Sequence, residues 1–493
     1  MIRRATIAML LGAATAFAQE IPDRPEKLQF EPIRFETPRV KDFQAKLKNG
    51  VPAFLAESGA EGTPLVRVTV SWRGGSYLDP KGREGLADLY GSQLVQGGTA
   101  KLDAAKLEDR LEALAATLTS ACWDTGCTIS LQVLDKDLTE GLDLLMQALR
   151  EPAFAQDRLD LAKRQARQRV SRRNDDVMSI ASYQMKYLLF GEGHFASAGD
   201  TAASLDAIGR DDLVAFHARL LHPKNLFVAA SGRFDRKAML DALNGTVGAI
   251  RPGPAAQVSP AVPAPDFARS PAIDVTDKSD APQAMIRWAF PGIRRTDPDW
   301  HAAFVTNQIL GGRGFTSRLM KRIRSDEGLT YGVYSTLEPG TYWRGDVTGG
   351  LQTKNRSVAY ALRLALEEIR KLQEQPVSED ELRVNKDGII EAFPSQWATK
   401  QAIATRFAEE AREGWPEDWW ASYREKIQAV TAADVQRMAR KLFDPAKMVI
   451  LVVGKASEIE AGDPDHPGEL KDIAPLPLRR VPLRDPETLK PMP

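Results

Sequence analysis

The 493-residue sequence has few of the side chains that build metal centres and disulfide frameworks, with two cysteines and five histidines. Two cysteines exclude a cysteine-rich zinc module and a small scaffold held by several disulfides. None of the histidines is followed four positions later by another, the spacing at which one helix face presents two ligands to zinc. A metal site assembled from residues distant in sequence is the alternative that this composition leaves open.

The two cysteines, Cys122 and Cys127, flank the segment Trp-Asp-Thr-Gly. In an oxidising compartment a disulfide between them would close this short turn. Two reduced, half-buried cysteines are the alternative, because turn geometry often keeps the two Cα atoms too far apart for a disulfide. The sequence leaves both interpretations open.

The sequence also lacks an excess of either charge, because 66 Lys and Arg balance 66 Asp and Glu. A net charge of zero gives no electrostatic reason to expect binding to nucleic acid or to an anionic membrane. Hydrophobic residues make up 43% and charged residues 27% of the chain, a mixture typical of soluble globular proteins. Because 493 residues exceed what one hydrophobic core accommodates, we expect two or more domains.

The N-terminus carries the pattern of an export signal. Arg3 and Arg4 precede an apolar run over residues 7–16, and Ala16-Phe17-Ala18 supplies the small-x-small pattern that signal peptidase accepts. We therefore expect a signal peptide over residues 1–18, an N-terminal extension over 19–42, and export, to the periplasm in a Gram-negative host and otherwise to the medium. The run is too short for a membrane anchor, so no membrane span is expected in the mature chain. A buried N-terminal helix is the alternative.

The chain repeats itself on either side of a linker over residues 251–272, which holds six prolines. Residues 207–232 and 429–454 align without a gap at an offset of 222. Each segment reads as an N-capped helix, a Pro-marked turn and an apolar strand that ends at a glycine. This order of elements indicates an internal duplication.

The remaining patterns predict an α+β fold with two homologous domains over residues 43–250 and 273–456. Each domain is expected to hold a mostly antiparallel sheet with helices packed on one face. Ser378-x-x-Glu381 predicts a capping box at the start of a helix. The Pro-rich tail over residues 457–493 is predicted to be flexible from Pro475 onward, with attachment to a partner as the alternative. The predicted strands and the other predicted helices cover residues 65–72, 283–290, 104–118, 136–149, 300–310 and 357–372.

Several motifs together resemble the insulinase/pitrilysin zinc peptidases, over about residues 43–455. In that family Gly-Leu-Ala is followed by H-x-x-E-H, whose two His bind zinc and whose Glu polarises the attacking water, and a distant Glu is the third ligand. At the matching positions this chain has Asp88, Gly91, Ser92 and Gln168, so the resemblance implies a degenerate site without bound metal. The motifs that carry the resemblance are Asn49-Gly-Val-Pro-Ala-Phe-Leu55, Arg73-Gly-Gly-Ser-Tyr-Leu-Asp-Pro80, Gly85-Leu-Ala87 and His194-Phe-Ala-Ser-Ala-Gly199.

A second set of matching residues lies in the C-terminal half. A glycine-rich turn with Gly311, Gly312 and Gly314, expected to contact substrate, leads to Arg324 and Tyr331, which are seven residues apart as in the family's Arg/Tyr segment. A positioned phenol can stabilise the negative charge that develops on an attacked carbonyl oxygen, and a guanidinium offers a rigid fork of donors. Without the resemblance, Arg324 reads as a solvated helix charge and Tyr331 as the start of a strand.

The resemblance therefore implies a noncatalytic subunit, inactive alone, that pairs with a related H-x-x-E-H subunit and completes its site and proteolytic chamber for peptides or unfolded proteins. Zinc is expected in that partner, and residues 119–123 are expected near the family's edge strand, where extended substrates bind. Two other functions stay open. One is a stand-alone peptide-binding or scaffold pseudo-peptidase, and the other is a hydrolase with an unrecognised site, although no G-x-S-x-G elbow is present.

Overall fold

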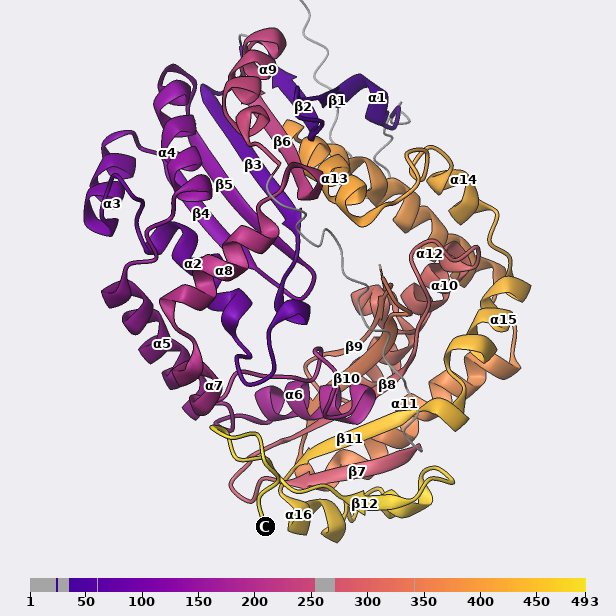
Figure 1. Cartoon of the computed structure of the whole chain (residues 1–493). Coiled ribbons are helices and arrows are strands. Elements are labelled where there is room, and N and C mark those ends of the chain that lie inside the picture. Colours follow the sequence, from indigo (N-terminus) through magenta and orange to yellow (C-terminus); the bar gives the residue numbers. More distant parts are fainter. Residues whose placement is uncertain (1–23, 25–34, 60, 253–270, 341) are drawn as a thin grey trace, which may run out of the picture. The chain divides into compact units, whose positions relative to one another are not determined.

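The computed structural model describes residues 24, 35–59, 61–252, 271–340 and 342–493. The predicted signal peptide, most of the N-terminal extension and most of the Pro-rich linker lie outside these residues. The chain divides into a unit of residues 1–36 and a compact unit of residues 37–493. All elements described below belong to the second unit (Figure 1).

The first domain contains a six-stranded mixed sheet in the order β1-β2-β6-β3-β5-β4. Only the pairing of β2 with β6 is parallel, and β4 lies at one edge. Its strands are β1 (Gln44–Lys46), β2 (Pro52–Ser58), β3 (Leu65–Arg73), β4 (Thr117–Cys122), β5 (Gly126–Leu134) and β6 (Leu226–Arg233). Its helices are α1 (Val40–Phe43), α2 (Leu86–Gln96), α3 (Ala104–Ala113), α4 (Leu138–Arg150), α5 (Gln156–Ser171), α6 (Val177–Phe190), α7 (Ala202–Ala207), α8 (Arg210–Leu220) and α9 (Arg236–Gly245).

The second domain repeats this plan with a mixed sheet in the order β12-β7-β11-β8-β10-β9. The β12–β7 and β7–β11 pairings are parallel, and β9 lies at an edge. The strands are β7 (Ala272–Asp277), β8 (Ala284–Pro291), β9 (Val333–Glu338), β10 (Asp346–Thr353), β11 (Val449–Gly454) and β12 (Leu478–Arg480). The helices are α10 (Trp300–Asn307), α11 (Val358–Glu374), α12 (Glu379–Ala392), α13 (Lys400–Glu413), α14 (Tyr423–Gln428), α15 (Ala432–Leu442) and α16 (Ala456–Ala461).

These two sheets confirm the predicted α+β class with two similar domains. The repeated segments adopt the same order of elements, because α8 and α15 cover positions that differ by the 222-residue offset, and a Pro-marked turn joins each helix to β6 or β11. Both helices have an aspartate in the first turn, Asp212 or Asp434, whose carboxylate accepts a hydrogen bond from the backbone N–H three residues earlier. The apolar strands β6 and β11 lie at the centre of their sheets, which explains the continuous burial of residues 226–231 and 449–454.

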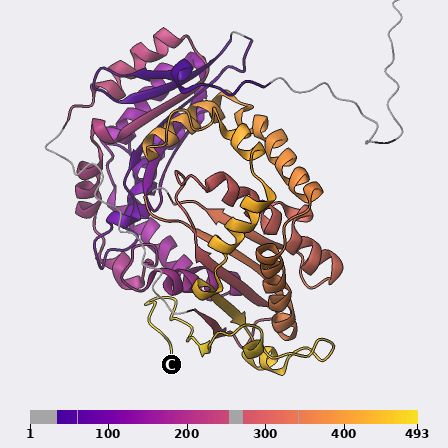
Figure 2. The ribbon, with the colours of Figure 1, turned by 90° about the vertical axis from the view of Figure 1, so that its right-hand side faces the viewer.

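The two domains exchange one helix each. Because alternate side chains of a strand point to opposite faces, Ala53 and Leu55 join the core formed with the first domain's own helices, whereas Phe54 faces the other way. There it meets Phe407 of α13, with ring centroids 6.4 Å apart, and α13 packs along β2, β6 and β3. Figure 2 shows this orange helix beside the indigo and magenta strands. In return, α6 packs on β8 and β11 of the second sheet.

The prediction of a flexible tail is wrong. Strand β12 extends the second sheet, and Arg479 makes a two-pronged ion pair with Asp274 of β7, whose side chain is fully buried. Beyond β12 the chain runs back to the first domain, where the Pro482 carbonyl accepts from Gln184 of α6 and the Pro486 carbonyl accepts from Arg173. A proline-rich segment lacks an apolar core of its own, but its carbonyls remain good acceptors, and these contacts order it.

Two local predictions also need correction. The helix predicted over residues 104–118 ends near Ala113, because the chain turns at Ala115, with a φ of 48°, and then enters β4. The capping box at Ser378 is half formed. The Ser378 hydroxyl accepts from the Glu381 backbone N–H, but the Glu381 carboxylate binds Arg318 instead of the Ser378 backbone.

Candidate functional site

Helix α2 carries three of the four positions that match the family's zinc site. Asp79 fixes the start of this helix, because its carboxylate accepts 2.9 Å hydrogen bonds from the backbone N–H groups of Gly85 and Ala87. Burial raises the pKa of Asp79 to about 7. Asp88 lies in the first turn with 64% of its side chain exposed, and Arg169 of α5 binds it with a nitrogen–oxygen distance of 2.9 Å. A guanidinium therefore occupies the neighbourhood in which a metal cation would have to sit.

Gly91 lies where the family places its catalytic Glu, and the edge strand β4 packs directly on it. A Cβ added at Gly91 would overlap the Cys122 backbone nitrogen and lie 2.8 Å from the carbonyl carbon of Ala121. The Ser120 hydroxyl donates a 2.6 Å hydrogen bond to the Gly91 carbonyl and fastens the strand to the helix. The contact leaves no room at this position for a side chain that could polarise a water.

The remaining two positions supply no ligand either. The Ser92 hydroxyl donates to the Leu89 carbonyl at 3.0 Å within the same helix, and Gln168 is exposed on α5. Among the residues that the structure describes, no group of three or more His, Cys, Asp or Glu side chains could hold a metal ion. Asp88, Gly91, Ser92 and Gln168 therefore do not fit a zinc ion.

Cys122 and Cys127 form a disulfide, which decides between the two interpretations that the sequence left open. They are cross-strand partners in the hairpin of β4 and β5, so the disulfide closes the ladder at its turn. The turn residue Trp123 lies under the guanidinium of Arg412 from α13, with 4.7 Å between the Arg412 Cζ atom and the ring centroid. The exchanged helix and the disulfide thus both fix the end of the edge strand.

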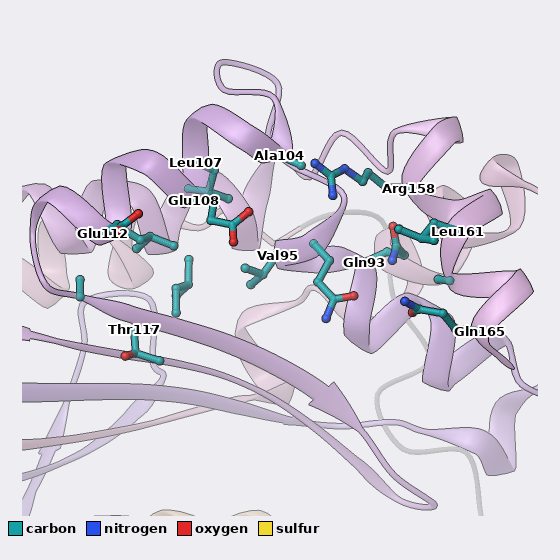
Figure 3. Close-up of a pocket in the computed structure, with 15 residues that line it drawn as sticks. Gln93, Val95, Ala104, Leu107, Glu108, Glu112, Thr117, Arg158, Leu161 and Gln165 are labelled. Carbon is teal, nitrogen blue, oxygen red and sulfur yellow. The ribbon is translucent and has the colours of Figure 1, made fainter. Parts of the chain in front are cut away.

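A cavity with a volume of about 690 Å³ lies beside the start of β4. Figure 3 shows α3 on one side, α5 on the other and the strand below. Aliphatic side chains such as Val95, Leu107 and Leu161 line it, and Glu108 and Glu112 of α3 add two carboxylates. The cavity is open to solvent and combines apolar walls with a few polar groups, the composition of many ligand pockets.

In the second domain, Gly311 and Gly312 end a π-helical segment over residues 308–312, and Gly314 lies between it and a second π-helical segment over residues 320–326. A Cβ at Gly311 would lie 2.7 Å from the Ser335 backbone nitrogen of β9, so only glycine allows this close approach. Gly314 has a φ of 55° and open space around it, and it turns the chain toward the second π-helix. Single π-helical turns within α-helices are frequent at functional sites.

Arg324 differs from the other arginines of this segment. Arg313 donates to the Asn385 carbonyl, Arg318 binds Glu381 through two nitrogens and Arg322 binds Glu327. The Arg324 guanidinium has no carboxylate within ion-pair distance among the described residues, and it lies over the ring of Phe315 at 4.4 Å. Within the part of the chain that the structure describes, the donors of Arg324 are therefore free for a ligand.

Tyr331 has 92% of its surface exposed and lies two residues before the start of the edge strand β9. Among the described residues, no hydrogen bond or ion pair joins Arg324 or Tyr331 to Asp88, Ser92 or Gln168, and Asp88 and Tyr331 line different cavities. Two residues beside these positions escaped the sequence analysis. Arg169 follows Gln168 directly, and Phe315 follows Gly314, but neither has a motif of its own.

Comparison with known proteins shows the family of this chain. Residues 56–186 match the family described as insulinase (peptidase family M16), and residues 207–389 match the peptidase M16 inactive domain. The chain belongs to the insulinase family. Because the residues at its zinc positions do not fit a zinc ion, it is a noncatalytic member.

Three relatives illustrate the match. A protein of Helicobacter pylori named non-peptidase homolog YmxG is 28% identical over 329 residues, which are 64% of this chain and 73% of that protein. A crystal structure of a peptidase M16 inactive domain from Pseudomonas fluorescens superimposes with a TM-score of 0.74 and 26% identity, over 83% of this chain and 97% of that one. The periplasmic protease PqqL of Escherichia coli shares the fold, with a TM-score of 0.69 and 15% identity over 83% of this chain and 45% of that one.

Among the described residues, no helix has both the length and the hydrophobicity needed to cross a membrane.

Proposed function

We propose that this protein is the noncatalytic subunit of a heteromeric zinc peptidase, to which it contributes Arg324 and Tyr331. One observation carries the proposal: the chain presents an uncommitted guanidinium and an exposed phenol although its own zinc positions are closed. A large tyrosine at 92% exposure gains little from burial, so its retention points to a contact outside the chain. Mere capture of a peptide needs no donor directed at a transition state.

The chemistry of the two side chains suits peptide hydrolysis at a partner's site. Zinc bound by an intact H-x-x-E-H subunit would supply an activated water. Tyr331 then donates its O–H to the carbonyl oxygen on which negative charge develops. Arg324 holds neighbouring substrate carbonyls with its planar fork of N–H groups, before and during the reaction. Gly312 and Gly314, which are both exposed, would let the backbone of the turn approach the substrate closely, whereas Gly311 is buried against β9 and supports the turn from inside the domain.

Peptides and unfolded segments are the proposed substrates. The edge strands β4 and β9 each have one edge that pairs with no other strand of the described residues, and an extended peptide can pair with such an edge. The disulfide between Cys122 and Cys127 supports the proposed location in an oxidising compartment, such as the periplasm of a Gram-negative host.

A stand-alone peptide-binding protein is the second candidate, and the cavity beside β4 favours it. That cavity keeps apolar walls next to an open sheet edge although the adjacent zinc positions are closed by Gly91 and Arg169. Such a protein would bind extended peptides without any partner and without turnover.

Reconstitution distinguishes the two candidates. The purified chain is mixed with a related subunit that carries H-x-x-E-H, and cleavage of a quenched fluorescent peptide is measured for each subunit alone and for the mixture. The proposal predicts turnover in the mixture and little in either subunit alone. Full activity of the H-x-x-E-H subunit alone, with no binding or stimulation by this chain, would favour the stand-alone candidate.

A further inference from the structure

The Phe315 side chain is largely exposed, so burial in a hydrophobic core does not explain why an aromatic residue stands at this position. The side chain is 69% exposed, at a position where a polar residue would cost nothing in burial. Its one described partner is Arg324, whose Cζ atom lies 4.4 Å from the ring centroid. The face of an aromatic ring attracts a guanidinium within about 6 Å, and stacking leaves the N–H groups in the guanidinium plane free to bind other groups.

Hydrogen bonds of Arg313 and Ser317 hold the turn that carries Phe315. Residues Gly314–Thr316 form a short 3-10 turn, in which the Ser317 hydroxyl donates to the Gly314 carbonyl at 2.7 Å. Arg313 crosses helix α12 at Gly388 and donates to the Asn385 carbonyl at 2.8 Å. A Cβ at Gly388 would overlap the Arg313 guanidinium, so glycine makes this crossing possible.

We infer that Phe315 is a positioning residue that holds the Arg324 guanidinium flat and pointed toward substrate. The turn and its Arg313 anchor fix the ring, and the ring restricts the side chain of Arg324, which no carboxylate among the described residues holds. A long arginine side chain loses considerable rotamer freedom when it binds, and a platform that restricts it beforehand reduces that cost. The role of Phe315 in substrate binding rests on the proposed function, whereas the stacking itself does not.

The stacking is tested on the isolated full chain by NMR of arginine side chains labelled with ¹⁵N. The Nε–Hε resonance of Arg324 is assigned by its absence from the Arg324→Lys spectrum. In the wild type the aromatic ring current places it upfield of an exposed arginine. Phe315→Leu, at an exposed position that tolerates substitution, should remove this displacement, and Phe315→Tyr should retain it. The Arg318 resonance, held by Glu381, serves as the internal reference and should not move in either variant.

A second arm uses the reconstituted peptidase. Phe315→Leu should raise KM about two- to fivefold, the loss expected for an exposed cation–π contact. Phe315→Tyr keeps an aromatic ring and should have the wild-type KM. An Arg324 resonance that does not move in Phe315→Leu overturns the inference, whatever the kinetics. If the resonance moves but KM changes only in Arg324→Ala, the positioning role is also refuted. If Arg324→Ala leaves the kinetics unchanged, the proposed function fails, while the NMR result still decides the stacking.

Discussion

The ion pair between Asp274 and Arg479 gives the sharpest stability prediction. Asp274 has no exposed surface, and both of its carboxylate oxygens receive hydrogen bonds from Arg479, at 2.8 and 3.0 Å. Arg479→Leu leaves this carboxylate buried without its cation. Removing one partner of a buried pair costs about 3–5 kcal/mol, because the remaining charge keeps its desolvation penalty. For a domain of this size that corresponds to a fall in Tm of about 6–20 °C.

The control for this prediction is the next residue. Arg480 pairs with Glu460, but both side chains are at least half exposed, so Arg480→Leu should cost no more than about 1 kcal/mol. Differential scanning calorimetry of both variants gives the comparison. The double variant Asp274→Asn, Arg479→Leu should recover part of the loss, since it removes the unpaired charge. Equal melting temperatures for Arg479→Leu and Arg480→Leu would refute the claim that the tail stabilises the second domain through this pair.

The remaining predictions concern the closed zinc positions and a buried acid. Gly91→Ala should destabilise the first domain by about 1–3 kcal/mol through overlap with Cys122, whereas Gly245→Ala, with open space around it, should be neutral or mildly stabilising in urea unfolding. Elemental analysis of the purified chain should find no stoichiometric zinc, and a chelator-sensitive peptidase activity of the chain alone would contradict this. Burial raises the pKa of Glu410 from 4.5 to about 7. Between pH 5 and 7 the folded state therefore keeps a proton that the unfolded state has released. Over this range the contribution of Glu410 to the free energy of unfolding should fall by about 1.4 kcal/mol per pH unit. Glu410→Gln should remove that component from the pH dependence of unfolding and still accept a hydrogen bond from Trp420; an unchanged profile would contradict the assignment.

The sequence was sufficient for the parts of the fold that depend on local patterns. The duplicated segments at an offset of 222 residues carried their caps, turns and apolar strands in the sequence itself, and β6, β11, α8 and α15 followed them. Strand β3 was predicted within one residue for the same reason, because its apolar residues alternate. The substituted zinc positions were assigned from the sequence through its resemblance to the family, and they stay a prediction.

Contacts between distant segments could not be predicted. The exchange of α6 and α13 depends on which sheet face each apolar stripe reaches, and periodicity does not specify the partner. The tail was misjudged because its stability comes from one buried carboxylate and from accepted backbone hydrogen bonds. Likewise, the contact of Gly91 with β4 and that of Gly388 with Arg313 appear only when the chain is folded, because a glycine in a helix has the same sequence signature whether or not another segment lies against it.

The most direct test of the proposed function is steady-state kinetics of Tyr331→Phe in the peptidase reconstituted with an H-x-x-E-H subunit. The substitution removes one exposed O–H and keeps the ring, so folding and assembly should be unchanged by circular dichroism. Loss of an oxyanion donor predicts a fall in kcat of about 10²–10³-fold with little change in KM. Tyr334→Phe, three residues farther along the chain in β9, is the matched control and should retain wild-type turnover. A near-wild-type kcat of the reconstituted peptidase that carries Tyr331→Phe would contradict the claim that this chain completes its partner's active site.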